Sequence, residues 1–357
     1  MRNYIKPLLL SLPFVHYGAA APPFTPSGGL GTNSTPPKYV PMSDFDFQSL
    51  NLALNQEWIE LDLFHNGLAR FSSEEFEAAG ITPEDQFLIQ KMADQEVGHA
   101  TMLSNILQGA GAKPCNYTYP FNTVREFVDF SQKLTRWGEA GVYGFIEHLD
   151  SRAAASLLVQ SITVEARQQL IFRQFEGLFP TPESFETGLT QSMAWTLLAP
   201  YLTSCPEENP RIEWQNFPGL NVTNAYPLDN SSVAALSTNR TALSVPGQNI
   251  TLAWEAPGKT VGYDGKYTTN TTAGPPLFAA WISQLNTTFT PLENIDADAK
   301  TASTQQPDAA IFPGNPAEIV NNTVFIVLTD SNPYVTPFNL SVLNAHVVAG
   351  PAVYLSG

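Results

Sequence analysis

The sequence predicts an α+β protein: an antiparallel four-helix bundle with a fifth helix, followed by a β-rich, sandwich-like C-terminal region. Three observations support this prediction. Apolar residues recur at helical three-four spacing between residues 43 and 203, with capping signals between the repeats. After Pro206 this spacing is replaced by short β-rich runs between Gly, Pro and Asn. Hydrophobic residues make up 43% of the 357 residues and charged residues 14%, which is the composition of a folded protein.

The chain begins with the features of a secretory signal peptide. Residues 1–6 are basic, residues 8–15 are apolar, and residues 17–21 offer small side chains for cleavage. We therefore expect a secreted, extracellular protein that could reach the cell wall. The expected organisation is a signal peptide over residues 1–20, a flexible leader over 21–42, the bundle over 43–203, a linker over 204–225 and a β-rich glycosylated domain over 226–357.

The net charge and the lack of a long apolar segment limit the binding partners that we expect. The net charge of −16 argues against binding to nucleic acid or to anionic membranes. After the signal peptide, no segment is long and apolar enough to span a membrane.

Glycosylation sequons are dense, especially after residue 220, as expected for a secreted protein. The sequon asparagines are Asn33, Asn116, Asn221, Asn230, Asn239, Asn249, Asn270, Asn286, Asn321 and Asn339. The chain has only two cysteines, Cys115 and Cys205. In an oxidising compartment we expect them to form one disulfide, and two free buried thiols are the alternative.

The first two helices are placed by their start signals. Ser43 with Asp46 resembles a capping box, and the helix that follows should end near Arg70. Thr82, followed by a proline and two acids, begins the second helix, which should stop at the glycines of residues 109–111.

Three further helices follow. Thr123 and Glu126 form a capping box for the third helix. The fourth should begin near residues 150–151. Thr181, again followed by proline and an acid, predicts a fifth helix that runs to about Tyr201.

Short runs in the last third of the chain predict strands of an antiparallel sandwich. They cover residues 242–245, 250–254, 278–281, 287–292, 324–328 and 346–348. Residues 244–254 resemble a pair of strands. In this region His346 is expected to be a core residue rather than a ligand. Four aromatic residues could form a sugar-binding platform, although core packing is the alternative: Trp254, Tyr263, Tyr267 and Trp281.

The four long helices each carry an acid on their apolar stripe. These acids are Glu57, Glu96, Glu139 and Glu165, and two of them are followed three residues later by His99 and Gln168. Converging buried carboxylates would repel one another unless they were protonated or paired with cations. Arg136 and Arg167 are the basic residues nearby in sequence, and either could point outward. The pattern therefore favours a metal ion, and hydrogen bonds between helices are the alternative.

Four segments resemble a known family. They are residues 50–64, Asp-Gln-Glu-Val-Gly-His-Ala at 94–100, Gly-Glu-Ala-Gly-Val-Tyr-Gly at 138–144 and Thr-Val-Glu-Ala-Arg-Gln at 163–168. Together they resemble secreted fungal ferritin-like proteins, which are described as late-sexual-development and stress-response proteins and are related to plant desiccation-related proteins. The resemblance covers nearly the whole mature chain.

This resemblance implies a ferritin-like bundle with an appended β-rich region. It also implies a metal site with one acid from each long helix and His99 beside Glu96, with Glu60 as a substitute for Glu57. Gln168 stands where metal-binding bundles of this class carry a second histidine. An amide oxygen ligates less strongly than imidazole, which argues against an efficient di-iron ferroxidase. Oxygen ligands with one imidazole suit iron or manganese, as one ion or a pair.

Three functions remain open at this point. The first is a secreted metal protein that holds iron or manganese, at most a metal-dependent oxidoreductase of the ferroxidase or peroxidase kind. The second is a non-enzymatic cell-wall, spore or surface protein that keeps a relic metal site and binds polysaccharide or another protein. A carbohydrate-active enzyme is disfavoured, because no carboxylate pair across a cleft is evident outside the bundle.

Overall fold

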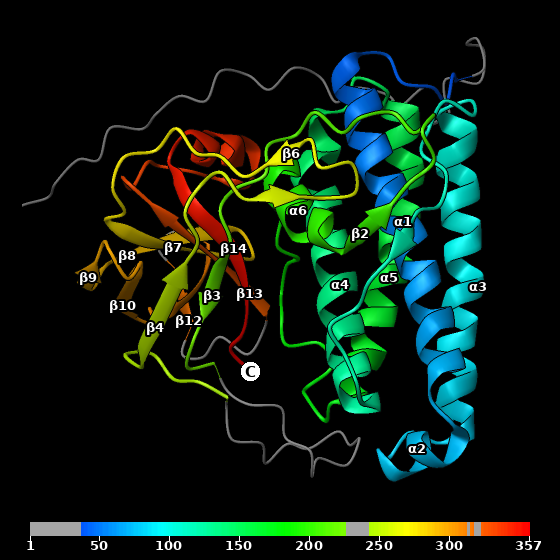
Figure 1. Ribbon diagram of the computed structural model, residues 1–357, viewed down its shortest axis with the longest axis horizontal. Helices are drawn as coiled ribbons and strands as arrows, with labels where there is room; N and C mark the ends of the chain where they lie inside the picture. Colours follow the sequence, from blue (N-terminus) through cyan, green and yellow to red (C-terminus); the bar gives the residue numbers. More distant parts are fainter. Residues whose placement is uncertain (1–36, 226–242, 313–314, 318–322) are drawn as a thin grey trace, which may run out of the picture. The chain divides into compact units, whose positions relative to one another are not determined.

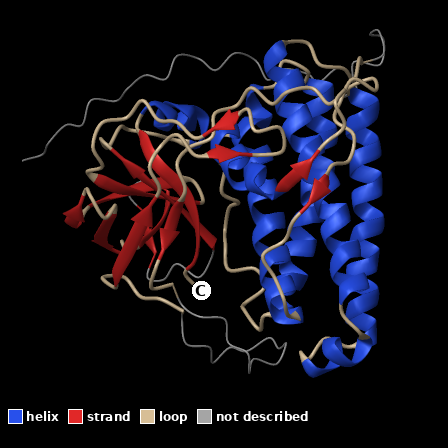
Figure 2. Ribbon diagram, in the orientation of Figure 1, coloured by secondary structure: helices blue, strands red, loops and turns tan. Residues whose placement is uncertain are grey.

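The computed structural model of the chain describes residues 37–225, 243–312, 315–317 and 323–357. Helices occupy the first part of this chain and strands the second, so the protein is α+β as predicted (Figures 1 and 2). Residues 38–357 form one compact unit. The predicted signal peptide and most of the predicted leader lie outside the described residues.

Six α-helices are present in the described residues, and the four long ones begin where their start signals predict. The six are α1 (Asp44–Arg70), α2 (Ser73–Ala78), α3 (Pro83–Ile106), α4 (Val124–Phe145), α5 (Arg152–Phe175) and α6 (Gln191–Leu198). The side chains of Ser43, Thr82 and Thr123 each accept a hydrogen bond from a backbone N–H in the first turn of their helix. The short helix α2 was not expected from the sequence. Among the described residues, no helix has the length and apolar character needed to cross a membrane.

The predicted start of the fifth helix is wrong. No helix begins at Thr181, and α6 begins ten residues later, capped by Thr190. The intervening segment packs against α4 instead, where the backbone N–H of Leu189 donates to the carbonyl of Ala140 over 2.7 Å. A Cβ atom on Gly144 would overlap the Leu189 carbonyl, so the glycine permits this close approach.

The strands form two four-stranded antiparallel sheets, ordered β3-β4-β10-β9 and β14-β13-β7-β8. The first contains β3 (Leu220–Val222), β4 (Asn249–Trp254), β9 (Glu293–Asp296) and β10 (Thr301–Gln305). The second contains β7 (Phe278–Ser283), β8 (Asn286–Pro291), β13 (Thr323–Thr329) and β14 (Val347–Leu355). Three two-stranded ribbons pair β1 (Asn116–Tyr117) with β2 (Leu202–Ser204), β5 (Thr260–Val261) with β6 (Tyr267–Thr268), and β11 (Ala309–Phe312) with β12 (Asn315–Ala317).

Strands β7 and β13 are buried on both faces of their sheet. Alternate residues of these strands join the hydrophobic cluster of the helices, namely Ala280, Ile282, Phe325 and Val327. The residues between them join a cluster shared with the other sheet, namely Ala279, Trp281, Val324 and Ile326. This alternation is the two-residue period of a strand, and it places the sheet between the bundle and the second sheet.

Most of the strand predictions correspond to observed strands. The runs at 250–254, 278–281, 287–292 and 324–328 fall on β4, β7, β8 and β13, and 346–348 overlaps the start of the longer β14. Residues 244–254 do not form a strand pair, because β4 pairs with β3 and β10. Ser244 lies before β4 in a loop, where its hydroxyl donates to the carbonyl of Ser356.

The aromatic residues proposed as a sugar platform do not form one. Trp281 is buried in the sandwich, and the ring of Tyr267 packs 5.1 Å from that of Trp195 in α6. His346 is partly exposed, and its Nδ1 lies 2.9 Å from Asp330 and 2.8 Å from Ser331. It is therefore hydrogen-bonded, as predicted, but it lies at the edge of the core.

Cys115 and Cys205 form a disulfide beside the β1–β2 ribbon, with an S–S distance of 2.01 Å. Of the sequon asparagines, Asn116, Asn221, Asn249 and Asn270 are exposed, whereas Asn286 and Asn339 are partly buried. Asn33, Asn230, Asn239 and Asn321 lie outside the described residues. Glycosylation stays a prediction.

Candidate metal centre

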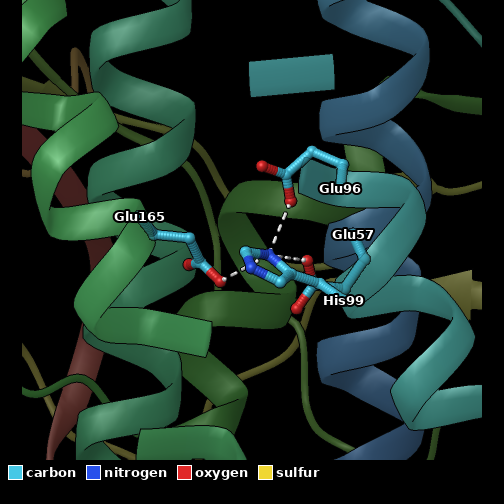
Figure 3. Close-up of side chains that lie close together, drawn as sticks. All are labelled: Glu57, Glu96, His99 and Glu165. Carbon is cyan, nitrogen blue, oxygen red and sulfur yellow. Dashed lines mark hydrogen bonds and ion pairs between the residues drawn. The ribbon is translucent and has the colours of Figure 1, made fainter. Parts of the chain in front are cut away.

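Three of the long helices bring acids and an imidazole to one point in the bundle core. Glu57 lies on α1, Glu96 and His99 on α3, and Glu165 on α5. Their potential ligand atoms all lie within 4.8 Å of one another. Figure 3 shows the three carboxylates around the imidazole ring. We call these four residues the His99 group.

The sequence places these side chains by helical spacing. Glu96 and His99 are three residues apart on α3, so they project from the same face of the helix. Glu57 and Glu165 occupy positions on their helices that would otherwise be filled by apolar residues. All three acids are almost completely buried, with exposed fractions of 3% for Glu57, 0% for Glu96 and 2% for Glu165.

A single nitrogen atom faces the three carboxylates. The Nδ1 atom of His99 lies 3.1 Å from Glu96 Oε2, 3.3 Å from Glu57 Oε2 and 3.6 Å from Glu165 Oε1. One ring nitrogen carries at most one proton, so it cannot donate a full hydrogen bond to each acid. The group therefore holds more acceptors than its imidazole can satisfy.

Burial and mutual repulsion dominate the electrostatics. Burial, then the charge of Glu96, raises the pKa of Glu57 well above its usual range. Burial, then the charge of Glu57, raises the pKa of Glu165 in the same way. Burial alone would lower the pKa of His99, but its hydrogen bond to Glu96 and the surrounding acids raise that pKa to about 9. Without a further cation, Glu57 and Glu165 tend to keep their protons.

Two more predicted residues lie at the edge of the His99 group. Gln168 of α5 donates from Nε2 to Glu96 Oε1 over 2.5 Å. Glu60 of α1 is fully buried and accepts from Gln56 over 2.8 Å, and burial, then the charge of Glu96, raises its pKa well above its usual range. Glu60 and Gln168 thus lie beside the His99 group, one on α1 and the other on α5.

The group contains buried acceptors that lack donors. Within the described part of the chain, Glu57 Oε2, Glu60 Oε2 and Gln168 Oε1 make no hydrogen bond. Buried polar atoms without hydrogen-bond partners are rare, because leaving them unpaired costs about 1 to 3 kcal/mol each. A divalent cation would satisfy these oxygens and offset the repulsion among the acids, so the residues present fit a metal.

Glu139 is the predicted ligand that the structure does not bring into the His99 group. It lies on α4 and pairs with Arg136, whose Nη1 is 3.3 Å from Glu139 Oε2. Glu183 and Glu186, from the segment before α6, also pair with this guanidinium. We call these four residues the Arg136 group. The acid already has a strong cationic partner, which is the physical reason that it lies apart from the others.

The sequence left the direction of Arg136 open, and the structure shows that the residue is buried, with only 1% exposed. The sequence did contain a signal that Arg136 pairs with Glu139. Arg136 precedes Glu139 by three residues, which is the spacing that identified Glu96 with His99. The roles of Glu183 and Glu186 could not be found in this way, because they lie on a segment that the sequence predicts to be helical.

The helical fold and the acid cluster define the class of protein. The model of the ferritin-like domain matches residues 45–178, which contain α1 except for Asp44, all of α2 to α5 and every residue of the His99 group. The chain is also 52% identical over 349 residues to Protein rds1 of Schizosaccharomyces pombe, covering 94% of this chain and 86% of that protein. The chain therefore belongs to the family of fungal ferritin-like proteins that includes rds1.

Proposed function

We propose that the bundle binds iron or manganese, as one ion or a pair, through Glu57, Glu96, His99 and Glu165. The observation that carries this proposal is the convergence of three buried carboxylates on one imidazole nitrogen, with acceptors left over. Carboxylate oxygens with a single imidazole suit these hard ions better than copper or zinc. Glu60 and Gln168 are further oxygen donors at the edge of the same group.

The residues of this chain limit the chemistry. A bound iron or manganese ion would supply redox chemistry with oxygen or peroxide. The protein would orient the ion through α1, α3 and α5, and the Gln168 amide would fix Glu96 by its hydrogen bond. Because an amide replaces the second histidine, we propose weaker metal binding than in an efficient ferroxidase.

We further propose that the protein is secreted and glycosylated and acts in sexual development or the stress response. The basic and apolar N-terminal segments, the sequons and the resemblance of the four core segments support this proposal. It is independent of the metal and is tested by detecting the protein and its glycans in the culture medium.

Elemental analysis tests the metal proposal. The protein would be secreted from a eukaryotic host beside the double variant Glu96→Ala/His99→Ala. A matched control is Asp330→Ala/His346→Ala, which also removes a contacting acid and histidine but lies outside the bundle core. We expect near-stoichiometric iron or manganese in the parent and the control, and little in the first variant.

A metal content that is low in all three proteins, also after incubation with Fe²⁺ or Mn²⁺, would contradict the proposal. The bundle would then be a scaffold whose acids are held by protons and hydrogen bonds. The search for function would move to the β-rich region.

A further inference from the structure

A groove separates α3 from α5 on the surface of the bundle, next to the His99 group. Its cavity volume is about 200 Å³. Leu88, Met92 and Ile171 give it apolar walls, while Lys91 and Arg167 stand at its sides. The side chain of Lys91 is 58% exposed, and Arg167 and Leu88 are also exposed, so the groove opens to solvent.

Gln168 is the wall between this groove and the acids. It lines the groove, yet only 2% of its surface is exposed. Its Nε2 atom donates both to Glu96 Oε1 and, over 3.1 Å, to Gln95 Oε1. One amide therefore separates the solvent-exposed groove from a carboxylate of the candidate metal centre.

The same amide has an oxygen that is not used within the protein. Within the described residues, Gln168 Oε1 is buried and makes no hydrogen bond. It is one of the oxygens that a metal ion in the His99 group would satisfy, so the residue that closes the groove also belongs to the edge of the candidate metal centre.

The charges at the sides of the groove favour an anion. Lys91 reaches in from α3 and Arg167 from α5, so the two cations come from opposite walls. Lys91 is balanced in part by Asp94, 3.0 Å away. In the part of the chain that the structure describes, the guanidinium of Arg167 forms neither an ion pair nor a hydrogen bond, so it is free to bind a carboxylate.

We propose that the groove binds a small organic acid: the apolar body lies on Met92 and Ile171, and the carboxylate meets Arg167 and Lys91. The volume is below the roughly 300 to 1,000 Å³ of pockets that hold drug-sized ligands, so the ligand is a short-chain carboxylate. Its inner end lies against Gln168, one side chain away from Glu96.

Binding in the groove requires no metal. Only the further step, in which the carboxylate is the molecule presented to the metal centre, rests on the proposed function. The two ideas can therefore fail separately, since metal content tests one and ligand binding to the metal-free protein tests the other.

Calorimetric titration of the full chain with hexanoate tests the groove. We expect saturable binding, and weaker binding of the uncharged 1-hexanol. Arg167→Gln should weaken hexanoate binding roughly threefold to fivefold, the effect of losing one exposed ion pair. Arg152→Gln is the matched control, because Arg152 lies on the same helix but donates to the carbonyl of Glu147, away from the groove.

A second pair of variants tests the place of binding. Val164→Trp fills the groove and should abolish hexanoate binding, whereas Val159→Trp, at an exposed position on the same helix, should not. The absence of saturable binding would overturn the proposal. Equal binding of hexanoate and hexanol, unchanged by Arg167→Gln, or binding that survives Val164→Trp, would also overturn it.

Discussion

The His99 group and the Arg136 group each place three carboxylates around one side chain that can carry positive charge, but the two side chains differ. In the Arg136 group, a guanidinium that is always charged pairs with Glu139, Glu183 and Glu186. In the His99 group, one imidazole faces Glu57, Glu96 and Glu165. The comparison shows that buried acids alone do not indicate a metal. The indication comes from acids grouped around a histidine, because an imidazole can itself ligate a metal whereas a guanidinium cannot.

Removing the cation of the Arg136 group should have the largest effect. Arg136→Met leaves Glu139 and Glu183 buried without their partner, and breaking a buried pair in this way costs about 3 to 5 kcal/mol. We expect this loss in the free energy of unfolding, measured with denaturant. Arg152→Met, an exposed control on α5, should change it by less than about 0.5 kcal/mol. A small loss in Arg136→Met would contradict a buried charged pair between Arg136 and these acids.

The pH dependence of stability should show the next largest effect, and Glu139 of the Arg136 group contributes in the same direction, because burial, then the charge of Glu186, raises its pKa as well. In the metal-free protein, Glu57, Glu60 and Glu165 have raised pKa values in the folded state. Between about pH 4.5 and these raised values, only the unfolded state loses the protons, so stability falls as the pH rises. His99 continues the fall, because its pKa is about 9 in the folded state and about 6.5 when unfolded.

Bound metal should reverse this trend, because its ligands must be deprotonated. The measurement is thermal unfolding from pH 4.5 to 9, with and without Mn²⁺. Glu57→Gln/Glu165→Gln, which removes two of the titrating acids, should flatten the metal-free curve. A metal-free parent whose stability is constant over this range would contradict the assignment of unbalanced acids to the His99 group.

The smallest effect should come from Glu139→Gln. Arg136 keeps Glu183 and Glu186, so the loss should be about 1 kcal/mol, the value of one buried hydrogen bond. Metal content, measured by elemental analysis, should equal that of the parent because Glu139 is outside the His99 group. If the metal is lost while the protein stays folded, Glu139 must be counted among the ligands after all.

Local signals were sufficient for most of the helices and for part of the site. The capping residues fixed the starts of the long helices, since a cap depends on neighbours within a few residues. The three-residue spacing of Glu96 and His99, and the apolar stripes around Glu57 and Glu165, identified all of the His99 group. These features lie within one helix each, so the sequence displays them directly.

The failures came from contacts between distant segments. Thr181 begins the same Thr-Pro-Glu pattern as Thr82, yet only Thr82 starts a helix. Two backbone N–H groups that a helix start would need, those of Ser184 and Phe185, donate instead to the side chain of Gln284. Arg136 draws the acids of this segment toward α4. Glu183 and Glu186 are far from Arg136 in the sequence and leave no local pattern, whereas Arg136 stands three residues before Glu139 and was a local signal that the prediction did not use.

Strands β7 and β13, which are covered on both faces of their sheet, limit where the chain can be cut into folding fragments. The ferritin-like match ends at residue 178, but Trp195, Phe325 and Val327 complete the hydrophobic cluster of the helices. A fragment that ends at that boundary would expose the apolar surface that these residues cover, and it would tend to aggregate. The family boundary is therefore not a folding boundary, and helices and strands should melt together in one cooperative transition.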